Sequence, residues 1–170
     1  MENYIVETRN LKKYYQQGTN TVKALDGVDF RVKAEEFVAI IGKSGSGKST
    51  LLHMIGGLDV PTSGSVIVGG KNLAGLTKEQ LAIFRRRKIG FVFQSYNLIP
   101  HQSVLSNVEL ALTISGVGLA ERKERARKAL EQVGLGEQLH KKPSQMSGGQ
   151  MQRVAIARAL INDPAFILAD

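Results

Sequence analysis

A run of glycines and serines between two strongly patterned stretches constrains this chain more than any other feature. Residues 42–49 read Gly-Lys-Ser-Gly-Ser-Gly-Lys-Ser. The continuous apolar run 37–41 before them is typical of a strand covered on both faces, and the residues from Lys48 onward have a helical pattern. A glycine turn that joins a buried strand to a helix is a feature of α/β folds, and its glycines allow the backbone to approach a bound group closely.

This segment fits the pattern G-x-x-x-x-G-K-[ST], whose residue types suit a phosphate chain. Successive backbone N–H groups can curve around phosphate oxygens, and the start of the following helix adds positive potential. Lys48 can reach the outer phosphates, and the Ser49 hydroxyl can take a Mg²⁺ coordination position. The alternative, a turn that binds nothing, leaves the flanking strand and helix patterns unexplained. The loop alone leaves kinases, GTPases, helicases and transport ATPases open.

The hydrophobic pattern elsewhere predicts an α/β protein in which 170 residues form one domain. Residues 4–8 and 28–32 alternate apolar and polar, as in a half-exposed antiparallel sheet, whereas 89–93 and 165–169 predict buried strands. Helical patterns cover 77–88, 103–113, 119–133 and 151–161. Buried strands separated by helices predict a parallel core sheet with a helical insert.

A second glycine-opened helix follows residue 147. Ser147-Gly148-Gly149-Gln150 places a serine at the N-cap and a glutamine three residues later, as in a capping box. Two glycines at the helix start can form a second anion site, but the same residues also fit a well-capped surface helix.

The formal net charge of +8 is compatible with nucleic acid, an acidic membrane surface or a polyanionic ligand. We attribute it to the surface and to a phosphate site, because the basic run 85–88 closes a predicted helix and Glu121 and Glu124 each precede a cation by four residues. The chain has no cysteine, and its three histidines are far apart, so we expect no metal cage built by the protein and a cytosolic setting. The sequence contains no apolar run of about 18 residues, the length that would predict a membrane span.

In order and spacing, several segments resemble the motifs of ATP-binding cassette subunits. They are 42–50, Gln94 after 89–93, 145–150 with Arg153, and 166–170. Segments 56–59 and 90–100 are most similar to the bacterial subgroup for lipoprotein release, antimicrobial-peptide and macrolide export, and cell division. The resemblance implies a P-loop nucleoside triphosphatase core with a parallel sheet. Its parts would be an N-terminal antiparallel β region (1–36), the core to Gln94 (37–95), a helical subdomain (96–148), and the signature helix with its following strand (149–170).

The resemblance also implies roles for single residues. Tyr15, or Tyr14 as the alternative, would stack on adenine; Gln94 would contact Mg²⁺ and the attacking water; Asp170 would hold Mg²⁺ through water. The expected catalytic residues are Lys48, Gln94, Ser147 and Asp170, and the expected metal contacts are Ser49, Gln94 and Asp170. The expected nucleotide contacts are Tyr15, Gly42, Lys43, Ser44, Gly45, Ser46, Gly47, Lys48, Ser49, Thr50, Gln94, Ser147, Gly148, Gly149 and Gln150.

The implied function is binding of MgATP and its hydrolysis to power a transmembrane permease, on the cytoplasmic side of the plasma membrane. ATP would join two copies head to tail, so that Ser147, Gly148 and Gly149 complete the γ-phosphate site of the opposite copy. Family members continue past the aspartate with a catalytic glutamate and a switch histidine, so we expect a C-terminally incomplete chain whose turnover needs those residues. Lys43, where an uncharged residue is usual, and Met146, in place of leucine, are departures from the pattern.

Three alternatives remain. A DNA-repair or chromosome-structuring ATPase would need a long insert between Lys48 and Ser147, for which there is no room, so no nucleic acid is expected. A translation-associated ATPase and a fragment unable to hydrolyse ATP are the other two. The transported cargo cannot be deduced from this sequence.

Overall fold

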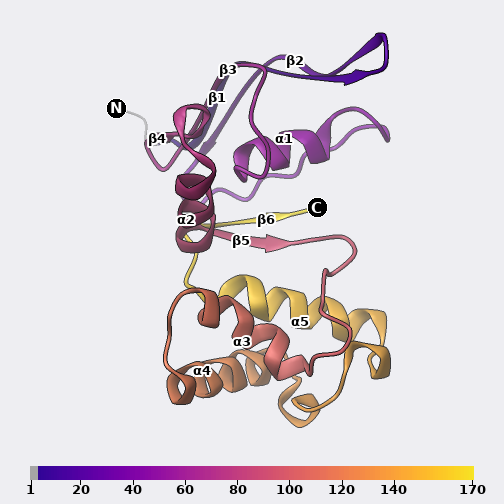
Figure 1. Ribbon diagram of the computed structural model, residues 1–170, viewed down its shortest axis with the longest axis vertical. Helices are drawn as coiled ribbons and strands as arrows, with labels where there is room; N and C mark the ends of the chain where they lie inside the picture. The colour runs from indigo at the N-terminus through magenta and orange to yellow at the C-terminus, as the bar shows by residue number, and fades with distance from the viewer. Residues whose placement is uncertain (1–3) are drawn as a thin grey trace. The chain divides into compact units, whose positions relative to one another are not determined.

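The computed structural model describes residues 4–170, which divide between two compact units, Met1–Ile83 (unit 1) and Phe84–Asp170 (unit 2). Figure 1 labels the elements of both units. Unit 1 contains an antiparallel sheet and one helix after the glycine-rich segment, and unit 2 contains a parallel strand pair with three helices. The chain therefore has the mixed α/β class predicted from its sequence. Within residues 4–170, no helix has both the length and the apolar character needed to cross a bilayer.

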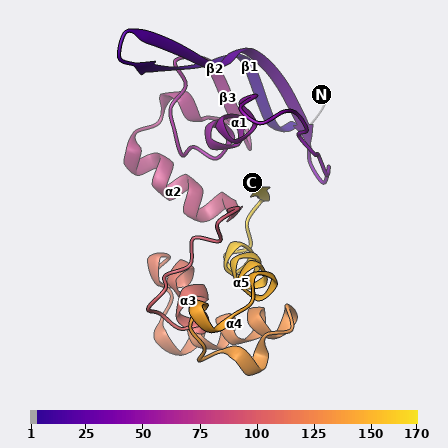
Figure 2. The same ribbon diagram turned by 90° about the vertical axis from the view of Figure 1, so that its right-hand side faces the viewer.

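The sheet of unit 1 has the strand order β2-β1-β3-β4. Strands β1 (Tyr4–Gln17) and β2 (Asn20–Lys33) form a long hairpin, and β3 (Ser63–Val68) pairs antiparallel with the first half of β1 (Figure 2). The short β4 (Lys71–Asn72) completes the sheet. The two alternating stretches are therefore antiparallel strands, as predicted, although both extend well beyond the predicted bounds.

Helix α1 (Lys48–Ile55) packs its apolar face on this sheet. Leu51, Met54 and Ile55 are buried, and α1 contacts β2 and β3. Gly64 lets β3 approach β1, because a Cβ there would lie 2.3 Å from the backbone oxygen of Asn10. The remaining elements of this part of the chain are η1 (Leu73–Gly75) and the start of α2 (Lys78–Lys88), where Thr77 and Gln80 form a capping box.

The strand predicted over 37–41 is wrong for this structure. No strand is assigned there, and Phe37 and Ile41 are 96% and 90% exposed. A strand needs a neighbour that completes its backbone hydrogen bonds, and the described four-stranded sheet of unit 1 does not include this segment. An apolar run therefore indicates that a segment tends to be buried, but it does not show which neighbouring strand would pair with it.

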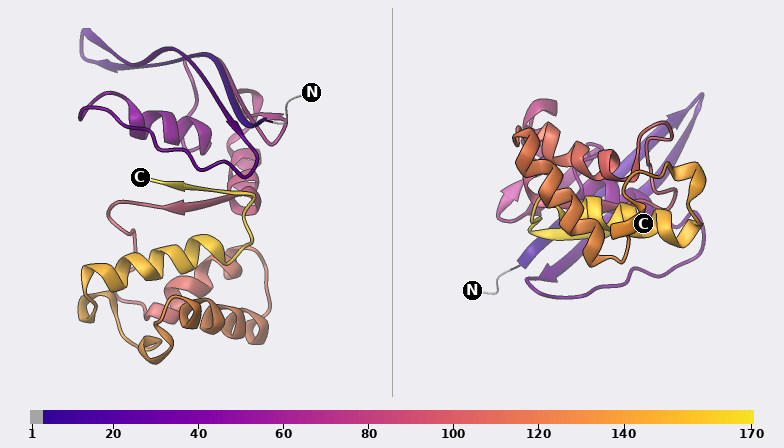
Figure 3. Two further views of the ribbon diagram at one scale, coloured as in Figure 1. Left: turned by 180° about the vertical axis from the view of Figure 1, so that it is seen from behind. Right: turned by 90° about the horizontal axis from the view of Figure 1, so that it is seen from below.

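Unit 2 contains the parallel pair that the sequence predicted. Strands β5 (Ile89–Val92) and β6 (Phe166–Ala169) are hydrogen-bonded in register, Ile89 opposite Phe166. Their burial is only partial, since Leu168 is buried but Ile167 is 49% exposed, so β6 does not have the coverage expected of a central strand. Figure 3 shows helix α5 (Gly148–Leu160) beside this pair.

The helices of unit 2 share one apolar core. Helices α3 (Val104–Ile114), α4 (Leu119–Gln132) and α5 pack together around buried residues such as Val108, Leu130 and Val154. The two short turns are η2 (Gly136–Gln138) and η3 (Pro143–Gln145). Helix α4 ends just before Gly134, whose φ of 72° permits the turn, as predicted.

Candidate nucleotide-binding site

The glycine-rich segment of unit 1 turns sharply into α1. Gly45 and Gly47 have φ of 77° and 89°, and the N–H of Leu51 donates to the Gly47 oxygen at 2.8 Å, which begins the helix. A Cβ on Gly47 would lie 2.4 Å from the backbone oxygen of Ala24, so only glycine fits there. Among residues 4–170 no side chain caps α1, and its first turn carries no acid. The positive end of α1 is therefore available to an anion.

Lys48 folds back onto the segment that it follows. Its ammonium donates to the backbone oxygens of Gly42 at 3.0 Å and Lys43 at 2.7 Å. A Cβ on Gly42 would lie 2.9 Å from the Ser46 hydroxyl, so the Ser46 side chain would have to shift to admit it. Residues 42–46 are exposed, so the loop closes around a cation at the surface, where a phosphate chain can reach it.

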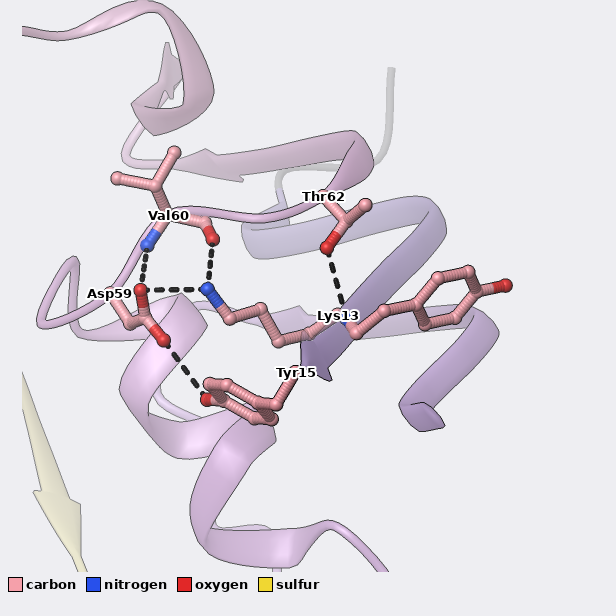
Figure 4. Close-up of polar contacts among 6 residues, drawn as sticks. Lys13, Tyr15, Asp59, Val60 and Thr62 are labelled. Carbon is pink, nitrogen blue, oxygen red and sulfur yellow. Dashed lines mark hydrogen bonds and ion pairs between the residues drawn. The ribbon is translucent and has the colours of Figure 1, made fainter. Parts of the chain in front are cut away.

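Tyr15 lies on the α1 side of β1, and its hydroxyl group is hydrogen-bonded (Figure 4). Its hydroxyl donates to Asp59 Oδ2 at 2.9 Å, and the side chain of Thr50, in α1, interacts with the same hydroxyl. Burial and the Asp59 carboxylate raise the pKa of Tyr15, while Thr50 opposes them. Tyr15 as a whole residue is 37% exposed, so it is partly accessible to a ligand.

The Asp59 carboxylate accepts hydrogen bonds from three donors (Figure 4). Besides Tyr15, it accepts from Lys13 Nζ at 2.8 Å and from the Val60 N–H at 2.7 Å. Lys13 also donates to the Val60 oxygen at 2.8 Å. Burial by itself raises the pKa of Asp59, but Lys13, the Val60 N–H and Tyr15 together hold the pKa below its ordinary value.

Tyr14, the alternative to Tyr15, has different surroundings. Its hydroxyl donates to Asp26, Lys23 lies 5.5 Å from the centre of its ring, and its N–H donates to the Thr62 hydroxyl. Adjacent residues of a strand point to opposite faces. Tyr15, and not Tyr14, is thus the aromatic that the structure brings beside Thr50 at the start of α1.

In unit 2, the structure brings Gln94 and Asp170 to one edge. The parallel register pairs Val92 with Ala169, and the N–H of Asp170 donates to the Val92 oxygen at 3.0 Å. Gln94 and Asp170 are both exposed, just beyond the carboxyl ends of adjacent strands. Open α/β sheets place their ligands at such an edge.

Ser147 and Gln150 form the predicted capping box at the start of α5. The Ser147 N–H donates to Gln150 Oε1 at 2.9 Å, and the Gln150 N–H donates to the Ser147 hydroxyl at 3.3 Å. Gly148 and Gly149 are exposed in the first turn. The local structure is confirmed, and the phosphate contact of these residues stays a prediction.

Two contacts were not apparent from the sequence. The guanidinium of Arg158 donates to the backbone oxygens of Tyr96 and Asn97, both at 2.6 Å, and burial lowers its pKa. The bond between Lys13 and Asp59 joins residues 46 positions apart. No spacing rule in the sequence links either pair.

The expected Mg²⁺ contacts are all hard oxygen donors, which suit this ion. They are the Ser49 hydroxyl, the Gln94 amide oxygen and the Asp170 carboxylate. Over residues 4–170 no three His, Cys, Asp or Glu side chains gather as a metal site. The chemistry of the three donors therefore fits Mg²⁺.

Comparison with known proteins identifies the family of this chain. A family described as ABC transporter matches residues 25–170. An uncharacterized ABC transporter ATP-binding protein of Thermotoga maritima is 56% identical over 98% of this chain and 71% of that protein. The lipoprotein-releasing system ATP-binding protein LolD of Legionella pneumophila is 45% identical over 100% of this chain and 75% of its own length.

The fold matches a solved structure, a dimeric post-hydrolysis state of the ATP-binding cassette MJ0796 bound to ADP and Pi. The TM-score is 0.91 at 47% identity, over 97% of this chain and 73% of that one. The chain spans only 26% of a related but longer protein, the macrolide export ATP-binding/permease protein MacB of Hyphomonas neptunium. The chain thus belongs to the ABC transporter family of ATP-binding proteins, close to its lipoprotein-releasing and macrolide-export members.

Proposed function

We propose that this chain binds MgATP at residues 42–50 and that hydrolysis of this ATP, in an assembled ABC transporter, powers the movement of cargo across a membrane. The observation that carries the proposal is the opening of α1 on Gly47, with φ of 89° and no capping side chain among residues 4–170. The helix start offers backbone N–H groups and positive potential to a phosphate chain.

Lys48 supplies the mobile charge of this site. Its present acceptors are two backbone oxygens of the loop, at 2.7 Å and 3.0 Å. Phosphate oxygens are charged and therefore stronger acceptors than carbonyl oxygens. On binding, we expect the ammonium to leave the carbonyl groups of Gly42 and Lys43 for the outer phosphates.

Ser49, Gln94 and Asp170 would hold Mg²⁺, and this ion neutralises charge on the β- and γ-phosphates when bound. For hydrolysis, Lys48 would stabilise the charge on the γ-phosphoryl group during in-line attack by water. The side-by-side strand ends at Val92 and Ala169 support a shared task for Gln94 and Asp170 in orienting the ion and the water.

A second copy of the chain would complete the site through Ser147, Gly148 and Gly149. The capping box uses the Ser147 and Gln150 side chains within α5, and it leaves the glycines exposed in the first turn. The dimeric state of the matching cassette supports this arrangement. A transmembrane permease would be the other partner, and the protein would then lie at the cytoplasmic face of the plasma membrane.

The test is calorimetric titration of the chain with MgATP. We expect Lys48→Ala to weaken binding about 10- to 100-fold, because a charge-assisted contact to phosphate is lost. Lys71→Ala removes an exposed lysine of β4 and serves as the control. Equal affinity of wild type and Lys48→Ala would refute the site.

A further inference from the structure

We propose that Asp59 is a positioning residue for the nucleobase: together with Lys13 it holds the Tyr15 ring at a fixed place beside α1, so that one face of the ring receives the base. This inference rests on the proposed function, because it assumes that the ligand is a nucleotide whose phosphates lie at residues 42–50. It adds two residues, Lys13 and Asp59, that do not belong to the loop.

The Tyr15 side chain is fixed at both of its ends (Figure 4). The Cβ end is fixed by β1, and the hydroxyl end by the 2.9 Å hydrogen bond to Asp59. Asp59 is itself fixed, since its Oδ1 accepts from both Lys13 and the Val60 N–H. A ring tied at both ends has little freedom left to lose when a base stacks on it.

One face of the ring is already covered. The Lys13 ammonium lies 4.9 Å from the ring centre, within the range of a cation–π contact. Lys13 and Tyr15 are two residues apart on β1, and both reach the same carboxylate. A stacked base therefore has to approach the face of the ring opposite Lys13.

Asp59 also relates the ring to the phosphate loop. Helix α1 starts at Lys48, directly after the loop, and Asp59 lies in the turn that follows the end of α1 at Ile55. The Tyr15 hydroxyl also interacts with the Thr50 side chain, in the first turn of α1. The base platform and the phosphate loop are thus both attached to α1, within unit 1.

The chain contains a matched control on the other face of β1. Tyr14 donates to Asp26, and Lys23 lies near its ring, so the chemical groups are the same as those of Tyr15, Asp59 and Lys13. Tyr14 is not the tyrosine beside Thr50. Asp26→Asn therefore removes an equivalent hydrogen bond at a place that the nucleobase does not use.

The experiment compares two probes, MgATP and inorganic tripolyphosphate with Mg²⁺, which lacks the base. We expect Asp59→Asn to weaken MgATP binding about 2- to 10-fold, the cost of ordering one side chain, and to leave tripolyphosphate binding unchanged. Asp26→Asn should change neither. In a Tyr15→Phe background, Asp59→Asn should add nothing, because the phenol that it positions is already gone.

Equal weakening of both probes by Asp59→Asn would overturn the inference, because it would mean that Asp59 only maintains the fold. Unchanged MgATP affinity, or additive effects of Tyr15→Phe and Asp59→Asn, would also overturn it. Unchanged tripolyphosphate binding verifies that Asp59→Asn is folded. Failure of the proposed function looks different, since wild type would then bind neither probe.

Discussion

The two glycine-opened helices of this chain, α1 and α5, begin in opposite ways. Helix α1 begins after Gly47 without a capping side chain among residues 4–170, whereas α5 begins after Ser147 with a complete capping box. In α5 the Ser147 hydroxyl accepts from the Gln150 N–H, one of the first N–H groups of the helix. The glycine pattern alone therefore does not tell whether a helix start is capped, and at α5 the proposed phosphate contact lies with the exposed Gly148 and Gly149.

The largest loss of stability and of MgATP binding should come from adding a side chain at Gly47, directly before α1. Gly47→Ala combines a φ of 89° with a Cβ only 2.4 Å from the Ala24 oxygen, so we expect a loss of about 2–4 kcal/mol of stability and loss of MgATP binding. Urea unfolding and calorimetry measure both. Gly45→Ala is the control: its φ is 77° but the Cβ would meet nothing within 4 Å, so the cost should be about 1 kcal/mol. Equal costs for the two variants would contradict the steric argument.

A smaller loss of stability should come from replacing Arg158, near the C-terminal end of α5. Arg158→Met leaves the backbone oxygens of Tyr96 and Asn97 without their charged donor, and we expect a loss of about 2 kcal/mol of stability. Hydrogen exchange should show faster opening of residues 94–98, directly after β5. Arg153→Met, which loses one longer bond to the Val133 oxygen at 3.2 Å, is the comparison. Unchanged exchange in residues 94–98 would show that Arg158 does not hold this segment.

Removing the cap of α5 should cost less again. Ser147→Ala loses the 3.3 Å bond from the Gln150 N–H, and the expected loss is about 1 kcal/mol in urea unfolding. Ser144→Ala, outside the capping box, should be near neutral. If Ser147→Ala were also neutral, the capping box would not distinguish α5 from α1.

The smallest effect concerns pH. The pKa of Asp59 is lowered in the folded chain, so its stabilising contribution is present above the ordinary pKa of about 4 and is lost as pH falls through the lowered value. The urea midpoint of wild type should therefore fall more than that of Asp59→Asn below about pH 4. Parallel curves for the two proteins would contradict a lowered pKa.

Local patterns predicted most of the fold and the center of the candidate site. The helix starts at Lys48 and Ser147, the antiparallel hairpin and the parallel pair all follow from residues close in sequence. The strand over 37–41 could not be predicted correctly, because its formation depends on a partner strand. The choice of Tyr15 over Tyr14 depends on which face of β1 lies beside α1. The contacts of Asp59 and Arg158 join residues 46 and 62 positions apart, which no periodicity reveals.

Binding of the phosphates at the start of α1 can be followed residue by residue through the amide chemical shifts of the isotope-labelled chain, recorded with and without MgATP. We expect the largest shift changes on Gly45, Gly47, Lys48 and Ser49, with smaller changes around Tyr15. Saturable changes confined to other segments, with these four amides unmoved, would contradict it.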